Sequence, residues 1–279
     1  MIQKSYEESE NGKLYLIPTP IGNLEDITIR SINILKSVDI IFAEDTRQTS
    51  LLLKHLNINK RIESCHKYSE MKHKDKIINI LKSGKNIGYV TDRGTPLISD
   101  PGNIIVDECI KNNLSVISLP GPSALLPAIN MSGISNERFL FYGFLNSKKT
   151  LAKKELIKLK NLEYTLIFYE SPFRIFETLN IIMEVLGDRK IAIVREISKI
   201  YEEIIRGNIS EILNNIDTIK GEIVIIVEGN KNIDENKNVD YLKEINDLVD
   251  NGYSRRDAIR EIADKYNMSK NEIYNKYKE

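Results

Sequence analysis

The sequence predicts an α/β protein with two lobes, in which a parallel α/β domain precedes a second domain with a mixed sheet and a small helical tail. Short continuous apolar runs are typical of strands buried on both faces. These runs alternate with stretches of helical spacing, which favours βαβ units and a mainly parallel sheet. The length of 279 residues suits two domains and a small appendage.

The first domain is expected at residues 13–146, after a flexible polar tail at residues 1–12. Strands are predicted at residues 14–17, 39–43, 86–90 and 114–119, with helices around residues 29–38 and 51–55. Pro18 and Pro20 end the first strand. Residues 138–145 are interpreted as the last strand of this domain.

A basic segment marks the expected start of the second domain, at residues 147–230. It contains Lys148, Lys149, Lys153, Lys154, Lys158 and Lys160. Further strands are predicted at residues 164–169, 190–195 and 222–227, with residues 200–206 as a hairpin arm. This pattern predicts a smaller mixed sheet with fewer helices.

A polar linker at residues 230–238 precedes the helical module expected at residues 239–279. Leu242, Ile245 and Leu248 form one apolar stripe, which ends near Gly252. Ser254 and Ser269 are expected to cap two further helices.

Composition excludes several classes of protein. The 40 basic and 40 acidic residues balance, which argues against coating nucleic acid by bulk charge and leaves only local patches. Two cysteines, Cys65 and Cys109, cannot build a disulfide framework or a paired-cysteine zinc site, so we expect no metal and a reducing cytoplasm. We find neither a signal peptide nor an apolar run of the ~18 residues that span a bilayer.

Small and turn-forming residues follow four of the predicted strands, where α/β sheets bind ligands. These segments are residues 18–24, 44–47, 91–102 and 120–124. None matches the glycine patterns that bind dinucleotides or nucleoside triphosphates, so an uncharged or cationic ligand is indicated. Ser123 lies in an elbow-like turn, but no histidine follows His73, which excludes a hydrolase with the order Ser-Asp-His.

These segments resemble the signature loops of the tetrapyrrole methylase superfamily. They read PTPIGNL from Pro18, AEDTR from Ala43, GTPLISDPG from Gly94 and PGPSA from Pro120. Further matches are GFL from Gly143, FYESP from Phe168 and GE from Gly221. Within the superfamily they are similar to the branch that acts on ribosomal RNA. The resemblance implies 2′-O-methylation of a cytidine ribose in 16S ribosomal RNA by a homodimer that uses S-adenosylmethionine.

The resemblance also places the cofactor between the two domains. It assigns cofactor contacts to Thr19, Pro20, Gly22, Asp92, Gly94, Thr95, Ser123, Ala124 and Tyr169. Gly22 and Gly94 are expected to let the backbone approach the ligand closely. The chain departs from the family pattern at Arg93, Phe173 and Tyr201.

A ribose hydroxyl is a weak nucleophile, and a positioned base adds ~10²–10⁴-fold to the rate. The candidates are Glu44, Asp45, Glu170 and Lys199, with Asp26 and Asp100 as further carboxylates. Each carboxylate could instead cap a helix or form a salt bridge. Asp45 and Asp100 both fit the N-cap position of a helix.

RNA binding is expected from local patches. Arg47, Arg174 and Arg195 lie near the predicted site and suit phosphate contacts. Lys149 and Lys153 share one helical face, which could equally be a solvated surface.

Two other functions remain open from sequence. One is a methylase of a small tetrapyrrole, and the other is an RNA-binding assembly factor without catalytic activity. The basic segment and the helical module favour RNA methylation over the small-molecule activity. Arg93, inside a cofactor loop, supports the non-catalytic alternative.

Overall fold

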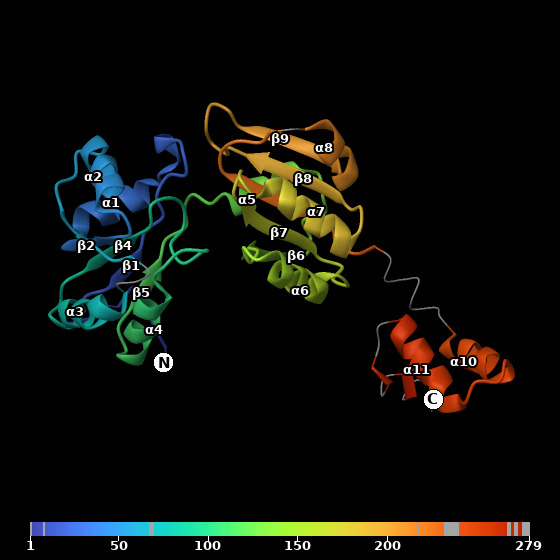
Figure 1. Cartoon of the computed structure of the whole chain (residues 1–279). Coiled ribbons are helices and arrows are strands. Elements are labelled where there is room, and N and C mark those ends of the chain that lie inside the picture. Colours follow the sequence, from blue (N-terminus) through green and yellow to red (C-terminus); the bar gives the residue numbers. More distant parts are fainter. Residues whose placement is uncertain are drawn as a thin grey trace. The chain divides into compact units, whose positions relative to one another are not determined.

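The computed structural model describes residues 2–7, 9–66, 70–216, 218–231, 240–266, 269–270 and 273–274. The chain up to Gly229 forms one compact unit, and the chain from Asn230 forms another. The first unit contains two five-stranded sheets, each covered by helices (Figure 1).

The first sheet is parallel throughout and has the order β3-β2-β4-β1-β5. Its strands are β1 (Leu14–Leu16), β2 (Ile40–Ala43), β3 (Arg61–Ser64), β4 (Ile87–Val90) and β5 (Val116–Ser118). Every residue of β2 and β4 is buried, which explains their continuous apolar sequence. The fold class predicted for this domain is confirmed.

Helices cover both faces of the first sheet. They are α1 (Ile29–Ser37), α2 (Thr46–His55), α3 (Glu70–Lys82) and α4 (Asn103–Lys111), with a short 3₁₀ helix, η1 (Leu24–Asp26). Helices α1 and α2 contribute Leu35 and Leu53 to the core on one face. Helices α3 and α4 contribute Ile77 and Ile105 to the core on the other face.

Strand β3 and helix α3 had no counterpart in the sequence prediction. The strand has the sequence Arg-Ile-Glu-Ser, and its burial pattern is that of an edge strand with both ends exposed. Such a segment has no continuous apolar run, so only its pairing with β2 defines it as a strand.

The second sheet is mixed and has the order β6-β7-β10-β8-β9. Its strands are β6 (Phe139–Phe144), β7 (Thr165–Glu170), β8 (Lys190–Arg195), β9 (Glu203–Asn208) and β10 (Ile223–Val227). Strands β6 and β7 pair in parallel, whereas the other pairs are antiparallel. The predicted hairpin arm is β9, shifted toward the C-terminus.

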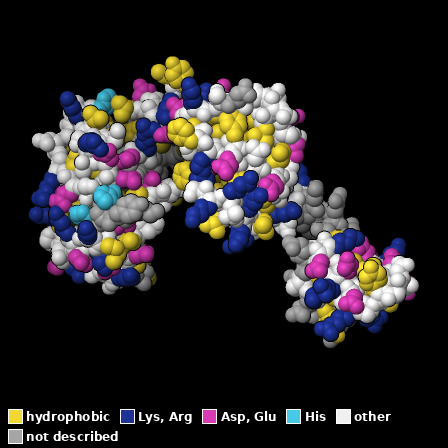
Figure 2. All heavy atoms as spheres, in the orientation of Figure 1, with side chains coloured by type: hydrophobic (Ala, Val, Ile, Leu, Met, Phe, Trp, Pro, Cys, Tyr) yellow, Lys and Arg dark blue, Asp and Glu magenta, His cyan; other side chains and the backbone are white. Residues whose placement is uncertain are grey.

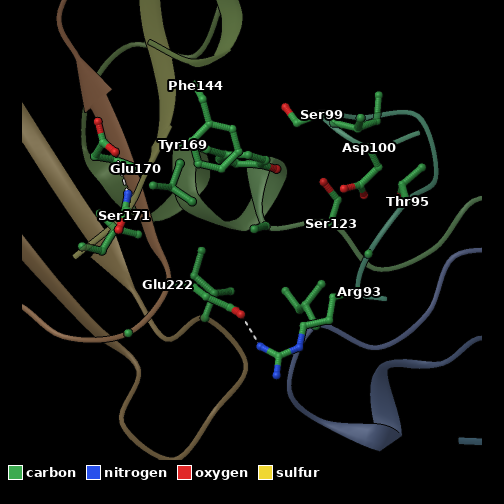
Figure 3. Close-up of a pocket in the computed structure, with 18 of the residues that line it drawn as sticks. Arg93, Thr95, Ser99, Asp100, Ser123, Phe144, Tyr169, Glu170, Ser171 and Glu222 are labelled. Carbon is green, nitrogen blue, oxygen red and sulfur yellow. Dashed lines mark hydrogen bonds and ion pairs between the residues drawn. The ribbon is translucent and has the colours of Figure 1, made fainter. Parts of the chain in front are cut away.

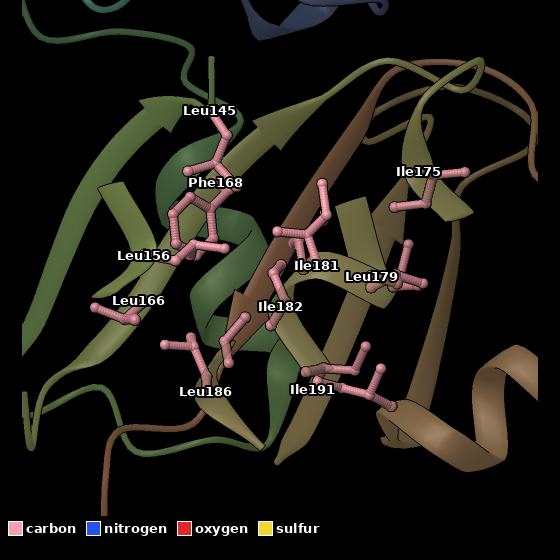
Figure 4. Close-up of a cluster of buried hydrophobic side chains, with 14 of the residues drawn as sticks. Leu145, Leu156, Leu166, Phe168, Ile175, Leu179, Ile181, Ile182, Leu186 and Ile191 are labelled. Carbon is pink, nitrogen blue, oxygen red and sulfur yellow. The ribbon is translucent and has the colours of Figure 1, made fainter. Parts of the chain in front are cut away.

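Four helices pack on the second sheet. They are α5 (Leu125–Ser132), α6 (Lys149–Leu159), α7 (Ile175–Leu186) and α8 (Ile209–Asn215). Helices α6, α7 and α8 enclose the larger core, in which Leu156 and Ile182 lie in one cluster with strand residues such as Phe168 (Figure 4). Helix α5 covers the opposite face with Ala128 and Ile129.

Two predictions about the division of the chain are wrong. Strand β6 pairs with β7, so residues 138–145 belong to the second sheet and not to the first. The second sheet is not smaller, because it has as many strands as the first. The hydrophobic pattern predicts a strand but not the strand with which it pairs. Helix α5, which precedes β6, already packs on the second sheet, so the chain passes to that sheet before β6 begins.

The polar N-terminal segment contacts the edge of the first sheet. The side-chain amide of Gln3 donates to the Val116 carbonyl (2.8 Å) and accepts from the Val116 amide (2.9 Å). These bonds occupy backbone groups that edge strand β5 would otherwise expose.

The second unit contains α10 (Tyr241–Asp250) and α11 (Arg255–Lys265), packed through Ile245 and Ile262. The Ser254 hydroxyl accepts from the Asp257 amide (3.2 Å), which confirms the predicted helix cap. Most of the predicted linker at residues 230–238, and much of the helix expected after Ser269, lie outside the described residues. No helix in the described part of the chain is long and apolar enough to cross a membrane.

Candidate active site

A cavity of about 400 Å³ lies between the loops of the first sheet and one face of the second sheet (Figure 3). Its volume falls in the range of small-molecule sites. The wall from the first sheet includes Gly94, Thr95, Ser99, Asp100, Ser123 and Ala124. The wall from the second sheet includes Phe144, Tyr169, Glu170, Ser171, Glu222 and Val224.

Hydrogen bonds between loops fix the first wall. Thr19 and Gly94 exchange two backbone bonds of 2.9 Å each, which joins the loops after β1 and β4. The Thr95 hydroxyl donates to the Pro122 carbonyl (2.9 Å) and so holds the loop after β5. Gly94 has a φ of +78°, a conformation that a residue with a side chain adopts only with strain.

Asp100 faces this cavity, with its carboxylate near the Ser123 hydroxyl (Figure 3). Burial raises the pKa of Asp100 to about 6, and the charges of Glu44 and Asp92 add to the increase. The alternative role considered for Asp100, a helix cap, is not found, because Gly102 occupies the N-cap position of α4.

A buried carboxylate from another helix satisfies the start of α4 instead. Glu70, at the beginning of α3, accepts from the Gly102 amide (3.0 Å) and from the Ile104 amide (3.3 Å). Sequence reasoning missed this cap because Glu70 is far from α4 along the chain. The Glu70 cap leaves the Asp100 side chain available to the cavity.

Aromatic rings form much of the second wall. Tyr169 on β7 contacts Phe144 on β6 edge to face, with ring centroids 5.7 Å apart. Burial raises the pKa of Tyr169 to about 12, and the Asp100 charge contributes to the increase. Tyr169 was predicted from the resemblance, whereas Phe144 was missed as a site residue. The GFL motif that contains Phe144 was the available signal.

Glu170 lines the cavity, but its side chain is buried and both of its carboxylate oxygens accept hydrogen bonds. One carboxylate oxygen accepts from the Ser171 amide (2.7 Å), and the other accepts from the Thr178 hydroxyl (2.6 Å). Arg174 lies 3.5 Å from the second oxygen. These contacts hold the turn before α7.

Lys199 is held in an ionic network at one end of the cavity. Its ammonium lies 2.8 Å from Glu196 and 3.1 Å from Glu222, and Glu222 also pairs with Arg93 from the first wall (Figure 3). A Cβ atom on Gly22 would lie 2.4 Å from Cγ of Lys199. Gly22 therefore gives room to the Lys199 side chain. Its contact with a ligand stays a prediction.

The predicted cofactor residues divide between two cavities. Gly94, Thr95, Ser123, Ala124 and Tyr169 line the first. Thr19, Pro20, Gly22 and Asp92 line a second cavity of about 280 Å³, and Arg93 borders both. Asp92 accepts from the Asp45 amide (2.9 Å), so part of its role is to hold the loop after β2.

Neither acidic residue after β2 lines these cavities. The Asp45 carboxylate accepts from the Arg47 amide (2.8 Å) and caps α2, which confirms the alternative role considered for it. The same bond lowers the pKa of Asp45. Burial raises the pKa of the half-buried Glu44, with a contribution from Asp92.

Several side chains predicted to bind RNA form ion pairs or hydrogen bonds within the protein. Arg195 pairs with Glu203 at 2.5 Å, and Lys153 pairs with Glu184. Arg174 donates to the carbonyls of Leu145 and Asn146. Arg47 also pairs with Asp45, at 3.4 Å, but its side chain and that of Lys149 are exposed.

No group of three His, Cys, Asp or Glu side chains suited to a metal ion occurs among the residues described. The cavity is lined by small hydroxyl residues, aromatic and aliphatic side chains, and the charged groups of Arg93, Asp100, Glu170 and Glu222.

Comparison with known proteins gives one consistent result. The family model described as Tetrapyrrole (Corrin/Porphyrin) Methylases matches residues 13–213. The chain is 46% identical to "Ribosomal RNA small subunit methyltransferase I" of Bacillus subtilis, over 97% of this chain and 95% of that protein. It is 41% identical to the protein of the same name from Buchnera aphidicola, over 95% of each.

Solved structures with low sequence identity share the fold. A diphthine synthase superposes with a TM-score of 0.62 at 14% identity, over 78% of this chain and 90% of that one. Uroporphyrin III C-methyl transferase from Thermus thermophilus gives a TM-score of 0.55 at 16% identity, over 77% and 97% of the two chains. The family match covers the first sheet and four strands of the second, and the relative from Bacillus subtilis extends the similarity over nearly the whole chain. Together they confirm the expected class of enzyme, a methyltransferase that uses S-adenosylmethionine. The chain belongs to the tetrapyrrole methylase family.

Proposed function

We propose that this protein transfers a methyl group from S-adenosylmethionine to the ribose 2′-oxygen of a cytidine in 16S ribosomal RNA. The observation that carries the proposal is the intact cavity in a chain that matches small-subunit rRNA methyltransferases over nearly its whole length. We further propose that it acts in the cytoplasm, on RNA within the small ribosomal subunit, as a homodimer.

The residues of the first cavity fit the cofactor. Ser123 and Ala124 lead into the N-terminus of α5, whose amide groups and dipole suit a carboxylate. Glu222 offers a carboxylate to the cationic groups, and Tyr169, Ile197 and Val224 offer an apolar surface to the adenine base. When bound, the cofactor supplies an electrophilic methyl group on a positively charged sulfur.

The protein's main task is then to hold the ribose oxygen in line with that methyl group. Asp100 is the carboxylate best placed to take the proton from the 2′-hydroxyl. It faces the cavity, and its pKa of about 6 keeps it ionised at neutral pH while making it a stronger base than an ordinary aspartate. Glu170 and Lys199 serve instead to hold the surrounding turn and the end of the cavity.

Primer extension at low nucleotide concentration tests the reaction directly. Small subunits from cells that lack this protein should acquire a ribose stop after incubation with the protein and S-adenosylmethionine. The stop should be absent without the cofactor. Subunits that gain no stop, despite calorimetric binding of S-adenosylmethionine, would exclude this substrate. Absence of calorimetric binding would instead favour the non-catalytic RNA-binding factor.

A further inference from the structure

We propose that four residues beside the cavity bind an unpaired stretch of RNA next to the target nucleotide. We call this set, Phe144, Phe173, Lys148 and Lys149, the aromatic rim. The inference rests on the proposed function and extends it, because it states where the RNA is held and by which contacts.

Phe173 is an unusual side chain for a surface position. It is 96% exposed, and it directly follows Ser171 and Pro172, which line the cavity. Its exposure does not come from a loose segment. The Phe173 amide donates to the Ser171 hydroxyl (3.3 Å), and the Arg174 amide donates to the Ser171 carbonyl (3.0 Å). A fixed turn therefore holds the ring in solvent, so the turn loses little conformational entropy when a base stacks on it.

Arg174 joins this turn to the segment between β6 and α6. Its guanidinium donates to the carbonyls of Leu145 and Asn146, at 3.2 Å each. Phe144, which immediately precedes that segment, is 54% exposed and lines the cavity. The two exposed rings thus flank segments that Arg174 joins, Phe144 at the end of β6 and Phe173 in the turn before α7.

Lys148 and Lys149 supply positive charge at the start of α6. Lys148 is the N-cap residue and makes no side-chain cap, and both lysines are exposed. Cations at a helix N-terminus oppose the helix dipole, so helix stability does not explain their position. Together with the amides at the same end of α6, they suit a phosphate group. Figure 2 shows Lys and Arg side chains gathered over the region of α6.

Exposed rings beside lysines are the chemistry that binds single-stranded RNA. Unpaired bases stack on aromatic side chains, and basic groups contact the backbone phosphates. A duplex would keep its bases paired and would not use the rings. A second copy of this chain could cover the apolar rings, but with zero net charge it offers no general attraction to the lysines. The chemistry of the aromatic rim therefore favours unpaired RNA.

Fluorescence of a short single-stranded oligoribonucleotide that contains 2-aminopurine tests the stacking. Binding to the whole protein should quench the fluorophore. Phe173→Ala should raise the dissociation constant about tenfold, within the effect expected for one stacked base, whereas Phe173→Tyr should keep both affinity and quenching. Ile200→Ala is the matched control, because Ile200 is 95% exposed on a different turn and should leave binding unchanged.

Methylation of small subunits provides the second measurement. Phe173→Ala should raise KM for the subunit about tenfold and leave kcat and the affinity for S-adenosylmethionine within twofold. Lys149→Ala should weaken RNA binding less and should reduce its dependence on salt. Each variant should keep the oligomeric state of the parent protein.

Two results would overturn the inference. One is a Phe173→Ala variant that binds the oligoribonucleotide and methylates subunits as the parent does. The other is a variant whose loss of activity follows from a change in oligomeric state, which would make the rim a contact between copies. These results differ from failure of the proposed function, in which the parent protein itself would not methylate the subunit.

Discussion

The two walls of the cavity are built in different ways. The first wall consists of loops that follow the strands of a parallel sheet, and its polar groups come from Gly94, Thr95, Asp100 and Ser123. The second wall consists mainly of side chains on or next to the strands of a mixed sheet, including Phe144 and Tyr169. The comparison teaches that the first wall supplies backbone and hydroxyl groups, whereas the second supplies aromatic surface and carboxylates, those of Glu170 and Glu222, that bind partners within the protein.

Asp100 gives the largest effect expected from the first wall. Asp100→Asn should lower kcat by about 10²–10⁴-fold, because the amide cannot accept the hydroxyl proton. In the parent protein, kcat should rise with pH up to about 6, where Asp100 becomes ionised, and then level off. The pH profile of single-turnover methylation measures both effects. If Asp100→Asn has the same pH profile as the parent protein, Asp100 takes no part in the proton transfer.

Asp100→Asn should make the protein more stable, although it should lower kcat. Folding raises the pKa of Asp100 from 3.8 to about 6, so the folded protein binds this proton more tightly than the unfolded chain. The free energy of unfolding should therefore fall as pH rises from about 4 to 6. Asp100→Asn should remove this fall and be about 1 kcal/mol more stable than the parent at pH 7.5. Denaturant titrations at pH 4 and 7.5 compare the two proteins.

Glu170 gives the largest stability effect expected from the second wall. Glu170→Ala would leave the Ser171 amide, the Thr178 hydroxyl and the Arg174 charge without their buried partner, at a cost of about 3 kcal/mol. Urea denaturation measures the loss. Glu177→Ala, on the first turn of α7, is a control outside the cavity and should change stability by less than about 0.5 kcal/mol. Similar losses in both variants would contradict the framing role of Glu170.

Asp45 allows a smaller test of the first wall. Asp45→Ala removes the N-cap of α2 and should lower the free energy of unfolding, because the Arg47 amide loses its acceptor. Asp45→Asn keeps a capping oxygen and should recover most of this loss. Neither substitution should change kcat by more than about twofold, because Asp45 lies outside both cavities. A large drop in kcat with Asp45→Asn would restore it as a candidate base.

The smallest effect is expected where the walls meet. Arg93 and Glu222 form an ion pair, but the side chain of each is more than half exposed. Arg93→Ala should therefore lower the free energy of unfolding by less than about 1 kcal/mol, and the difference should shrink in high salt. Thermal unfolding at low and high salt measures it. A larger, salt-independent loss would mean that the pair is needed to keep the walls together.

The sequence by itself determined the alternation of strands and helices, the loops of the first wall and the family. Buried parallel strands have continuous apolar sequences, and the loops that follow them lie at one sheet edge, so both features can be recognised locally. The cap from Asp45 to α2 is also local, because donor and acceptor are two residues apart. The cap of α11 by Ser254 is local too, with donor and acceptor three residues apart.

Only the tertiary structure decided the partners of distant segments. In the structure, β6 pairs within the second sheet. Glu70 caps α4, and Asp100 therefore faces the cavity. Glu170 accepts a hydrogen bond from Thr178, and Lys199 pairs with Glu196, which the sequence did not indicate. The physical reason is that strand pairing, desolvation and ion pairing depend on groups brought together by packing, and these groups have no fixed spacing along the chain.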